Sequence, residues 1–313
     1  MRVLITGASG FVGYHFIEAL REVCPASTEL IATAKTAEGD VEGLDITDRG
    51  AIDSAIARYR PSHVMHLAGI AAVPAAASAP DVTWRVHLNG TLNLARAILE
   101  IVPDCFLINA GSGLIYGASA KSGQLLDEDT LLAPLDDYSA SKAAADLALG
   151  ALAPQGLKCI RMRPFNHFGP RQSEQFVATA FATQIARIEA GLVEPVIRVG
   201  NLAAARDFLD VRDVAAAYAL AVVKSNAIVP GTILNLASGE ARRIDDLLNA
   251  LLSLSTVPIR VEEDPARLRP SDLPRIVGDA KKARDLLGWS PVHSFDKTLT
   301  EVLADCRSRL HEA

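Results

Sequence analysis

The sequence has few of the features that mark secreted, membrane-spanning or metal-binding proteins. Its four cysteines lie far apart with no metal-ligand spacing, so we expect reduced thiols and no metal site. No basic region, apolar stretch and cleavage site precede the first apolar segment, so no signal peptide is expected. The longest apolar run, residues 214–223, is about half a membrane span. We therefore expect a core helix there, no membrane partner and a cytoplasmic protein.

A strong charge of one sign is also lacking. The formal net charge is −6 and the basic residues are scattered, which argues against nucleic acid as a partner. Half of the residues are apolar and 22% are charged, which is typical of a soluble globular enzyme. A chain of 313 residues suits one large domain with a smaller one and needs no disulfides to bury a core.

Apolar strand-like runs alternate with helix-period segments through the first half of the chain. The predicted strands are 2–6, 29–34, 43–46, 63–68, 105–110 and 158–162, and the predicted helices are 11–23, 48–59 with Thr47 as N-cap, 80–101 and 138–152. Several strands are apolar throughout, as expected when helices cover both faces of a parallel sheet. The repeated β-α-β units predict an α/β fold with a doubly wound parallel sheet of the Rossmann type.

After Arg163 this alternation ends. Residues 164–200 and 257–277 are less regular, whereas a predicted helix over 211–224 and a predicted strand over 232–236 could return to the sheet. We therefore predict a dinucleotide-binding domain formed by residues 1–163 and about 201–256. A smaller, discontinuous α/β lobe for the substrate would contain about 164–200 together with 257–313.

A glycine-rich turn joins the first predicted strand to the first predicted helix. Gly7, Gly10 and Gly13 permit a tight turn, a close approach of backbone amides to a pyrophosphate, and close helix–strand packing. The alternative is a purely structural turn, but the position between strand and helix favours phosphate binding. We assign these glycines, with Phe11 and Val12, to a cofactor site.

The acidic residue that normally binds the ribose 2′-hydroxyl is missing. Residues 32–35, at the end of the second strand, read ATAK. Lys35 is available for a 2′-phosphate, so NADP is favoured over NAD, although Lys35 could also be a solvated loop residue. Asp45 is placed to meet the adenine, with Ile46 beside it; the structural alternative for Asp45 is to cap the next helix.

Three side chains with proton-transfer chemistry follow in order. Tyr138 and Lys142 lie four residues apart, on one face of a predicted helix. A lysine cation favours the phenolate and lowers the phenol pKa from about 10, so that the phenol can exchange a proton with a carbonyl or alcohol. Ser112, after the fifth strand, could hydrogen-bond the reacting oxygen. A surface contact or a helix cap would explain each one alone, but their order behind the glycine turn favours catalysis.

With these motifs the chain resembles an extended short-chain dehydrogenase/reductase (NAD-dependent epimerase/dehydratase family) from end to end. The matching segments are GASGFVG at 7–13, DITD at 45–48, HLAG at 66–69, Ser112 followed by LIYG at 114–117, YSASK at 138–142 and RPFNHFGPR at 163–171. The resemblance implies that Ser112, Tyr138 and Lys142 are the catalytic triad and that Lys142 also binds the nicotinamide ribose.

The resemblance also implies further contacts. It places Leu67, Ala68, Gly69 and His167 along or near the cofactor. It implies a homodimer that forms through helices 80–101 and 138–152, although these helices could simply cover the sheet.

The second half of the chain resembles the branch of this family that acts on GDP-mannose and related sugars. Arg206 and Arg269 offer planar guanidinium groups for a diphosphate, and Asn166 can bond a sugar or phosphate oxygen. A surface salt bridge is the alternative for each arginine alone. Arg171 and Val177 lie in the shared motifs, and we add both, with Ser112, to the candidate substrate site.

Dehydratases of this branch carry a glutamate base where this chain has Leu114, and leucine cannot remove a proton. The resemblance therefore implies NAD(P)H-dependent reduction of a nucleotide-linked 4-keto-6-deoxy sugar, with GDP-4-keto-6-deoxy-D-mannose to GDP-D-rhamnose favoured. The alternative is a nucleotide-sugar epimerase that retains its NAD. The intact triad argues against a third hypothesis, a non-catalytic dinucleotide sensor. His63, His66 and His87 have a spacing that fits packing.

Overall fold

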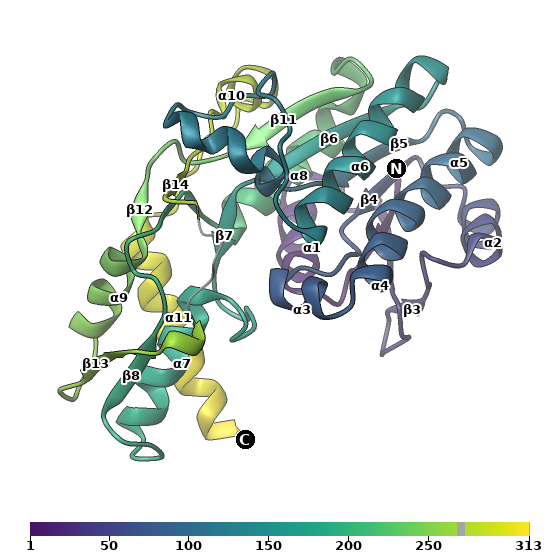
Figure 1. Ribbon diagram of the computed structural model, residues 1–313. Coiled ribbons are helices and arrows are strands. Elements are labelled where there is room, and N and C mark those ends of the chain that lie inside the picture. Colours follow the sequence, from purple (N-terminus) through teal and green to yellow (C-terminus); the bar gives the residue numbers. More distant parts are fainter. Residues whose placement is uncertain (268–272, 313) are drawn as a thin grey trace.

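The computed structural model describes residues 1–267 and 273–312, and its largest feature within these residues is a seven-stranded parallel sheet (Figure 1). In spatial order its strands are β11 (Thr232–Leu236), β6 (Cys159–Pro164), β5 (Phe106–Ala110), β4 (His63–His66), β1 (Arg2–Thr6), β2 (Glu29–Ala34) and β3 (Glu42–Gly43). Neighbouring strands are parallel throughout. The strand order reverses between β1 and β4, where open α/β sheets bind their ligands. The predicted doubly wound α/β fold is confirmed.

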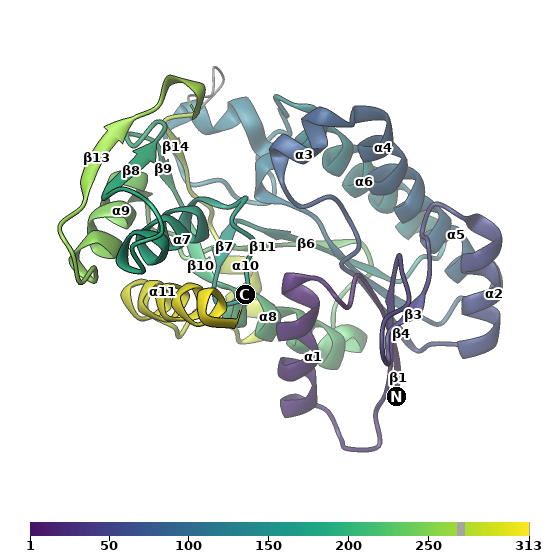
Figure 2. The same cartoon turned by 90° about the horizontal axis from the view of Figure 1, so that it is seen from below.

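Helices cover both faces of this sheet. On one face lie α1 (Phe11–Val23) and α8 (Val211–Lys224), and on the other lie α2 (Arg49–Tyr59), α5 (Thr91–Ile101) and α6 (Asp137–Leu152) (Figure 2). Side chains along a strand alternate between faces. Accordingly Val3 and Ile5 pack with α1 and α8, whereas Leu4 packs with α2 and α5. This two-sided burial explains why several of the strands are largely apolar.

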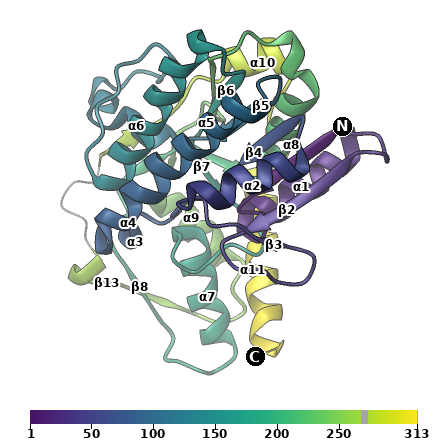
Figure 3. The same cartoon turned by 90° about the vertical axis from the view of Figure 1, so that its right-hand side faces the viewer.

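A second hydrophobic core lies beside the sheet. It is formed mainly by α7 (Val177–Glu189), α9 (Ile244–Ser253) and α11 (Phe295–Glu312), and α11 runs along α7 (Figure 3). Short sheets surround it: β7 (Asn166–Phe168) with β10 (Phe208–Asp210), β8 (Val196–Val199) with β13 (Arg260–Glu263), and β9 (Ala205–Arg206) with β12 (Arg242–Arg243) and β14 (Arg275–Ile276). The domain boundaries remain a prediction; α9 belongs to the predicted dinucleotide domain by sequence, and it packs in this second core.

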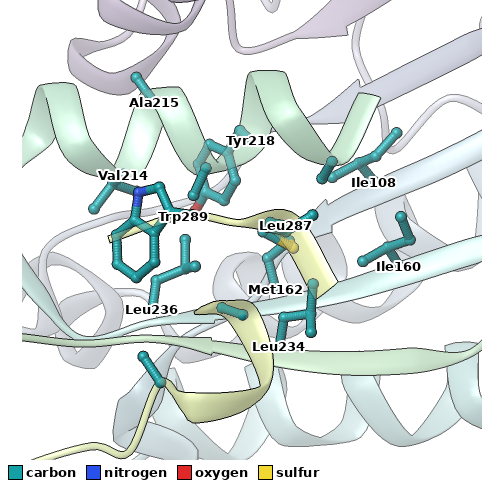
Figure 4. Packing of buried hydrophobic residues seen from close by; sticks show 14 of the residues in the cluster. Ile108, Ile160, Met162, Val214, Ala215, Tyr218, Leu234, Leu236, Leu287 and Trp289 are labelled. Carbon is teal, nitrogen blue, oxygen red and sulfur yellow. The ribbon is translucent and has the colours of Figure 1, made fainter. Parts of the chain in front are cut away.

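The chain returns to the main sheet near its C-terminal end. Leu287, the last residue of α10 (Lys281–Leu287), and Trp289 pack against Val214 and Tyr218 of α8 and against β11 (Figure 4). The indole Nε1 of Trp289 donates a hydrogen bond to the carbonyl of Asp213 at 2.8 Å. Residues distant in sequence thereby complete the core between α8 and β11.

Some predicted elements have the same bounds in the structure and others differ. Helix α8 and strand β11 have the predicted bounds, and β11 does return to the sheet. Strand β3 is shorter than predicted and begins one residue earlier. Thr47 was predicted to cap α2, but its hydroxyl donates to Asp45 Oδ1, and Asp48 instead accepts the capping hydrogen bond from the Ala51 amide.

The predicted helix over 80–101 is interrupted in the middle. It consists of α4 (Pro80–Trp84), a π-helical turn η1 (Arg85–Gly90) and α5, and it follows α3 (Val73–Ser78). After β5 the chain forms a 3-10 segment, η2 (Gly113–Ser122), which bends at Gly117. Short 3-10 turns, η3 (Ala153–Gln155), η4 (Ser225–Ala227) and η5 (Pro265–Arg267), complete the described elements. Across the described ranges, none of the helices is both long and apolar enough to span a membrane.

Candidate active site

The glycine turn after β1 is packed too closely for side chains. Gly7 has a φ of +75°, and a Cβ on it would lie 2.7 Å from the Ala68 amide nitrogen. A Cβ on Gly13 would lie 2.5 Å from the Ala8 carbonyl oxygen. Helix α1 begins directly after Gly10, so the positive end of its dipole faces the turn. This cradle fits the pyrophosphate of a dinucleotide, because backbone amides rather than side chains line it.

We expect Gly7→Ala to weaken coenzyme binding by about tenfold or more and to destabilise the fold by about 2–4 kcal/mol, through left-handed backbone strain and the clash with Leu67 and Ala68 after β4. The measurements are an NADPH fluorescence titration and urea unfolding. Gly123→Ala is the matched control, because Gly123 has a φ of +73° with open space around its Cβ position. Equal effects of the two substitutions would contradict the assigned role of the turn.

The segment after β4 lies directly beside this turn. The Leu67 amide donates to the carbonyl of Thr6 at 3.0 Å, and the Ala68 amide donates to the Thr6 hydroxyl at 3.3 Å. A Cβ built on Gly69 would lie 3.4 Å from the Lys142 Nζ atom. The structure therefore brings together three parts of the predicted cofactor site that lie far apart in sequence.

The residues assigned to the adenosine end have mixed environments. Lys35 is exposed at the end of β2. Asp45 accepts hydrogen bonds from the Thr47 amide and hydroxyl, which lower the pKa of its carboxyl together with the charge of Lys35. Ile46 is buried against Gly90 of η1. The structure leaves Lys35 accessible for a 2′-phosphate, while the cofactor contacts of Asp45 and Ile46 remain predictions.

The predicted catalytic triad converges at the carboxyl end of the sheet. A capping box made by Asp136 and Ser139 starts α6, and this places Tyr138 in its first turn and Lys142 one turn later. Ser112 follows β5 and is hydrogen-bonded to the Tyr138 phenol. Lys142 Nζ donates to the carbonyl oxygen of Ala110 at 3.0 Å. The hydroxyl, the phenol and the ammonium thus meet where β5 ends.

Burial governs the titration of this triad. It raises the pKa of the Tyr138 phenol, and the hydrogen bond with Ser112 lowers that pKa only in part. Burial also lowers the pKa of Lys142 to about 8. The predicted lowering of the tyrosine pKa by lysine is therefore wrong in direction: burial is the largest cause of the shift, and the Asp136 charge adds to it. A phenol with a raised pKa is protonated at neutral pH.

His167 connects the second half of the chain to the glycine turn. Its ring is nearly parallel to that of Phe11, with ring centroids 6.4 Å apart, and its Nδ1 lies 3.0 Å from the Phe165 carbonyl oxygen. Burial lowers the pKa of this imidazole. Asn166 precedes it on β7, which pairs with β10. The predicted cofactor residue His167 therefore lies beside the start of α1, and the predicted substrate residue Asn166 is its neighbour in β7.

The other predicted substrate residues are dispersed. The Arg171 guanidinium lies 4.1 Å from the centroid of the Tyr14 ring, and its backbone amide donates to Asp305. Arg206 donates to the carbonyls of Ala205 and Leu273 at 2.9 and 2.7 Å. Val177 begins α7. Arg269 lies outside the described residues. The substrate contacts of all four remain predictions.

Two features of the site were not predicted from the sequence. Asp146, one turn beyond Lys142 in α6, forms a buried ion pair with Arg163 of β6. His87, in the π-helical turn, contacts Ser141 between the two catalytic residues of α6. The i, i+4 spacing of Lys142 and Asp146 indicates a pair between these two side chains, whereas Asp146 pairs with Arg163 and Lys142 donates to the Ala110 carbonyl. No sequence signal identifies the partners of His87.

Comparisons with known proteins agree with this geometry. The model of the family described as GDP-mannose 4,6 dehydratase matches residues 4–302. The chain is 32% identical to a GDP-6-deoxy-D-mannose reductase from Pseudomonas aeruginosa, over 99% of each chain. The structure of RMD from Pseudomonas aeruginosa complexed with NADPH has a TM-score of 0.86 and 30% identity, over 98% of this chain and 99% of that one. A Thermus thermophilus UDP-glucose 4-epimerase in complex with NAD has a TM-score of 0.84 and 29% identity over 98% and 99%.

Proposed function

Because the chain belongs to the GDP-mannose 4,6-dehydratase family of extended short-chain dehydrogenases/reductases, we propose that it is a reductase of nucleotide-linked 4-keto-6-deoxy sugars. It is an oxidoreductase that modifies a nucleotide sugar with a nicotinamide dinucleotide. We further propose GDP-4-keto-6-deoxy-D-mannose as substrate and GDP-D-rhamnose as product. The likeness to a GDP-6-deoxy-D-mannose reductase along nearly the whole chain supports this choice.

The coenzyme that we propose is NADPH. The likeness to a structure complexed with NADPH supports it, as does the exposed Lys35 where a 2′-hydroxyl-binding carboxylate is missing. When bound, the reduced nicotinamide supplies the hydride. The residues that would hold the coenzyme are Gly7, Gly10, Phe11, Val12, Gly13, Lys35, Asp45, Ile46, Leu67, Ala68, Gly69, Tyr138, Lys142 and His167.

The chain's own residues would orient and protonate the carbonyl oxygen of the sugar. Ser112 donates its hydroxyl proton to this oxygen, beside the Tyr138 phenol with which it interacts. The phenol donates its proton as negative charge develops on the oxygen. The Lys142 ammonium stabilises the phenolate that results, because it is a cation one helical turn away. Asn166, Arg171, Val177, Arg206 and Arg269 are the proposed sugar and diphosphate contacts.

The observation that carries the reductase assignment is the Ser112–Tyr138 pair beside Leu114. Leu114 packs against the main core, and its amide donates to Ser112 Oγ at 3.1 Å. A leucine cannot remove a proton from the sugar, so this position does not supply the base needed for dehydration. The Tyr138 phenol, whose pKa is raised by burial, is protonated at neutral pH, and reduction of a ketone consumes a proton. Together these features favour ketone reduction.

An epimerase is the second candidate, and the likeness to a UDP-glucose 4-epimerase supports it. Such an enzyme would use the same triad but keep its nicotinamide bound through oxidation and re-reduction. The expected result for a reductase is stoichiometric NADPH oxidation with GDP-4-keto-6-deoxy-D-mannose, in a panel that includes dTDP- and UDP-linked 4-keto-6-deoxy sugars. Activity confined to a non-guanine nucleotide would overturn the substrate, and conversion without net coenzyme oxidation would overturn the reductase assignment.

We also propose that the chain forms a homodimer through α4, η1, α5 and α6. Val82 of α4 and Leu147 of α6 expose apolar side chains, and these two helices pack side by side. Burial of these exposed apolar side chains against a second copy would stabilise a dimer. Sedimentation equilibrium tests this proposal: a monomeric mass at micromolar concentration would contradict it.

A further inference from the structure

A buried chain of hydrogen bonds connects the end of β1 to η1. Thr6 Oγ1 lies 2.7 Å from His66 Nδ1, and His66 Nε2 lies 3.1 Å from Thr91 Oγ1. The Thr91 hydroxyl in turn donates to the backbone carbonyl of His87 at 2.6 Å. All four residues are between 1% and 3% exposed. The catalytic steps described above do not use these groups.

The imidazole of His87 extends this chain to the catalytic helix. Its Nδ1 lies 2.8 Å from Ser141 Oγ, and the Ser141 hydroxyl donates to the Tyr138 carbonyl at 3.0 Å. The Ile70 amide donates to His87 Nε2 at 3.1 Å. His87 Nε2 also lies 3.1 Å from the Ile70 carbonyl oxygen. Because the Ser141 hydroxyl already donates to the Tyr138 carbonyl, a proton on Nδ1 lets the ring donate to Ser141 and accept from the Ile70 amide.

The ring remains neutral under physiological conditions. Burial and, to a smaller extent, the nearby Lys142 charge lower the pKa of His87 to about 3. A neutral imidazole has one donor and one acceptor nitrogen, which is what the two contacts require. His87 therefore acts as a fixed bridge, and its protonation does not change near neutral pH.

The location of His87 gives this bridge its significance. The π-helical turn η1 interrupts the regular helix, and such turns are frequent at functional sites. The ring packs edge-on against the Tyr138 phenol, with centroids 5.5 Å apart. A Cβ on Gly69 would lie 3.4 Å from both His87 Nε2 and Lys142 Nζ. One side chain thus touches both the loop after β4 and the catalytic helix.

We propose that His87 is a positioning residue that fixes the 67–70 loop against the first turn of α6, and so aligns the coenzyme with the Tyr138 phenol. Its effect on turnover rests on the proposed function, whereas its effect on coenzyme binding does not. The bridge has two separable halves, one at Ser141 and one at Ile70.

Two substitutions of His87 each remove one of its two contacts. His87→Asn places an amide near the Nδ1 position and loses the Ile70 contact, so we expect the Kd for NADPH to rise about tenfold with a smaller loss of kcat. His87→Gln reaches toward Ile70 and loses the Ser141 contact, so we expect kcat to fall about tenfold with a smaller change in Kd. Ser141→Ala should match His87→Gln.

His63→Gln is the matched control, because His63 is a buried β4 histidine that contacts Ser62 and Ser225 away from this bridge. Equal changes in Kd and kcat for His87→Asn and His87→Gln, or losses no larger than in His63→Gln, would overturn the proposal. If the wild-type protein reduces no nucleotide sugar, the proposed function fails; the NADPH titration of His87→Asn then still decides the positioning role.

Discussion

Tyr138→Phe is expected to lower kcat by about 10²–10⁴-fold, the range that a positioned general acid contributes. Phenylalanine keeps the ring that packs edge-on against His87 but removes the hydroxyl that bonds Ser112. The proton for the carbonyl oxygen must then come from water, which cannot be positioned as well. The measurement is steady-state NADPH oxidation with the sugar nucleotide that the panel assay identifies.

The coenzyme should still bind to this variant, because the glycine turn and the loop after β4 are unchanged. Fluorescence titration with NADPH checks this expectation. Tyr59→Phe is the matched control. Tyr59 is the last residue of α2, and its hydroxyl donates to the exposed Glu42 of β3. A kcat for Tyr138→Phe close to that of Tyr59→Phe would remove Tyr138 from the mechanism.

The parts of the fold that could be predicted are those where one local signal dominates. The apolar run over 214–223 becomes the core of α8, and the alternation of strands and helices gives the parallel sheet. The glycine turn was predictable as well, because Gly7 and Gly13 are required by close backbone contacts that only glycine permits. These features depend on short stretches of chain.

The parts that could not be predicted depend on competition between neighbours or on distant contacts. Thr47 and Asp48 are both good caps, and only the hydrogen bond from Thr47 to Asp45 decides between them. The raised pKa of Tyr138 follows from burial in the fold, which the YSASK motif does not report. The contacts of His87 join residues 70 and 141, whose proximity no spacing rule reveals.

The ion pair of Asp146 also depends on contacts between residues distant in sequence, and we expect its loss to have a large effect on stability. Its Oδ1 accepts from Arg163 Nη2 at 2.7 Å and from Arg161 Nη1 at 3.0 Å, and its Oδ2 accepts from Arg163 Nε at 3.1 Å. Asp146 is 1% exposed and Arg163 is 2% exposed. Arg163 also donates to the Tyr116 hydroxyl, so the pair ties α6 and β6 to η2. The ion pair thus holds the helix that carries Tyr138 and Lys142 against β6 and η2.

Asp146→Ala is therefore expected to reduce the free energy of unfolding by about 3–5 kcal/mol, because it leaves the buried Arg163 without its counter-charge. Urea unfolding measures this loss. Asp146→Asn keeps hydrogen-bond acceptors and should lose less. Asp104→Ala is the control, because Asp104 pairs with Lys158 on the surface, where water screens the interaction and no measurable change is expected. Equal stabilities of Asp146→Ala and Asp104→Ala would show that α6 is held by its apolar packing alone.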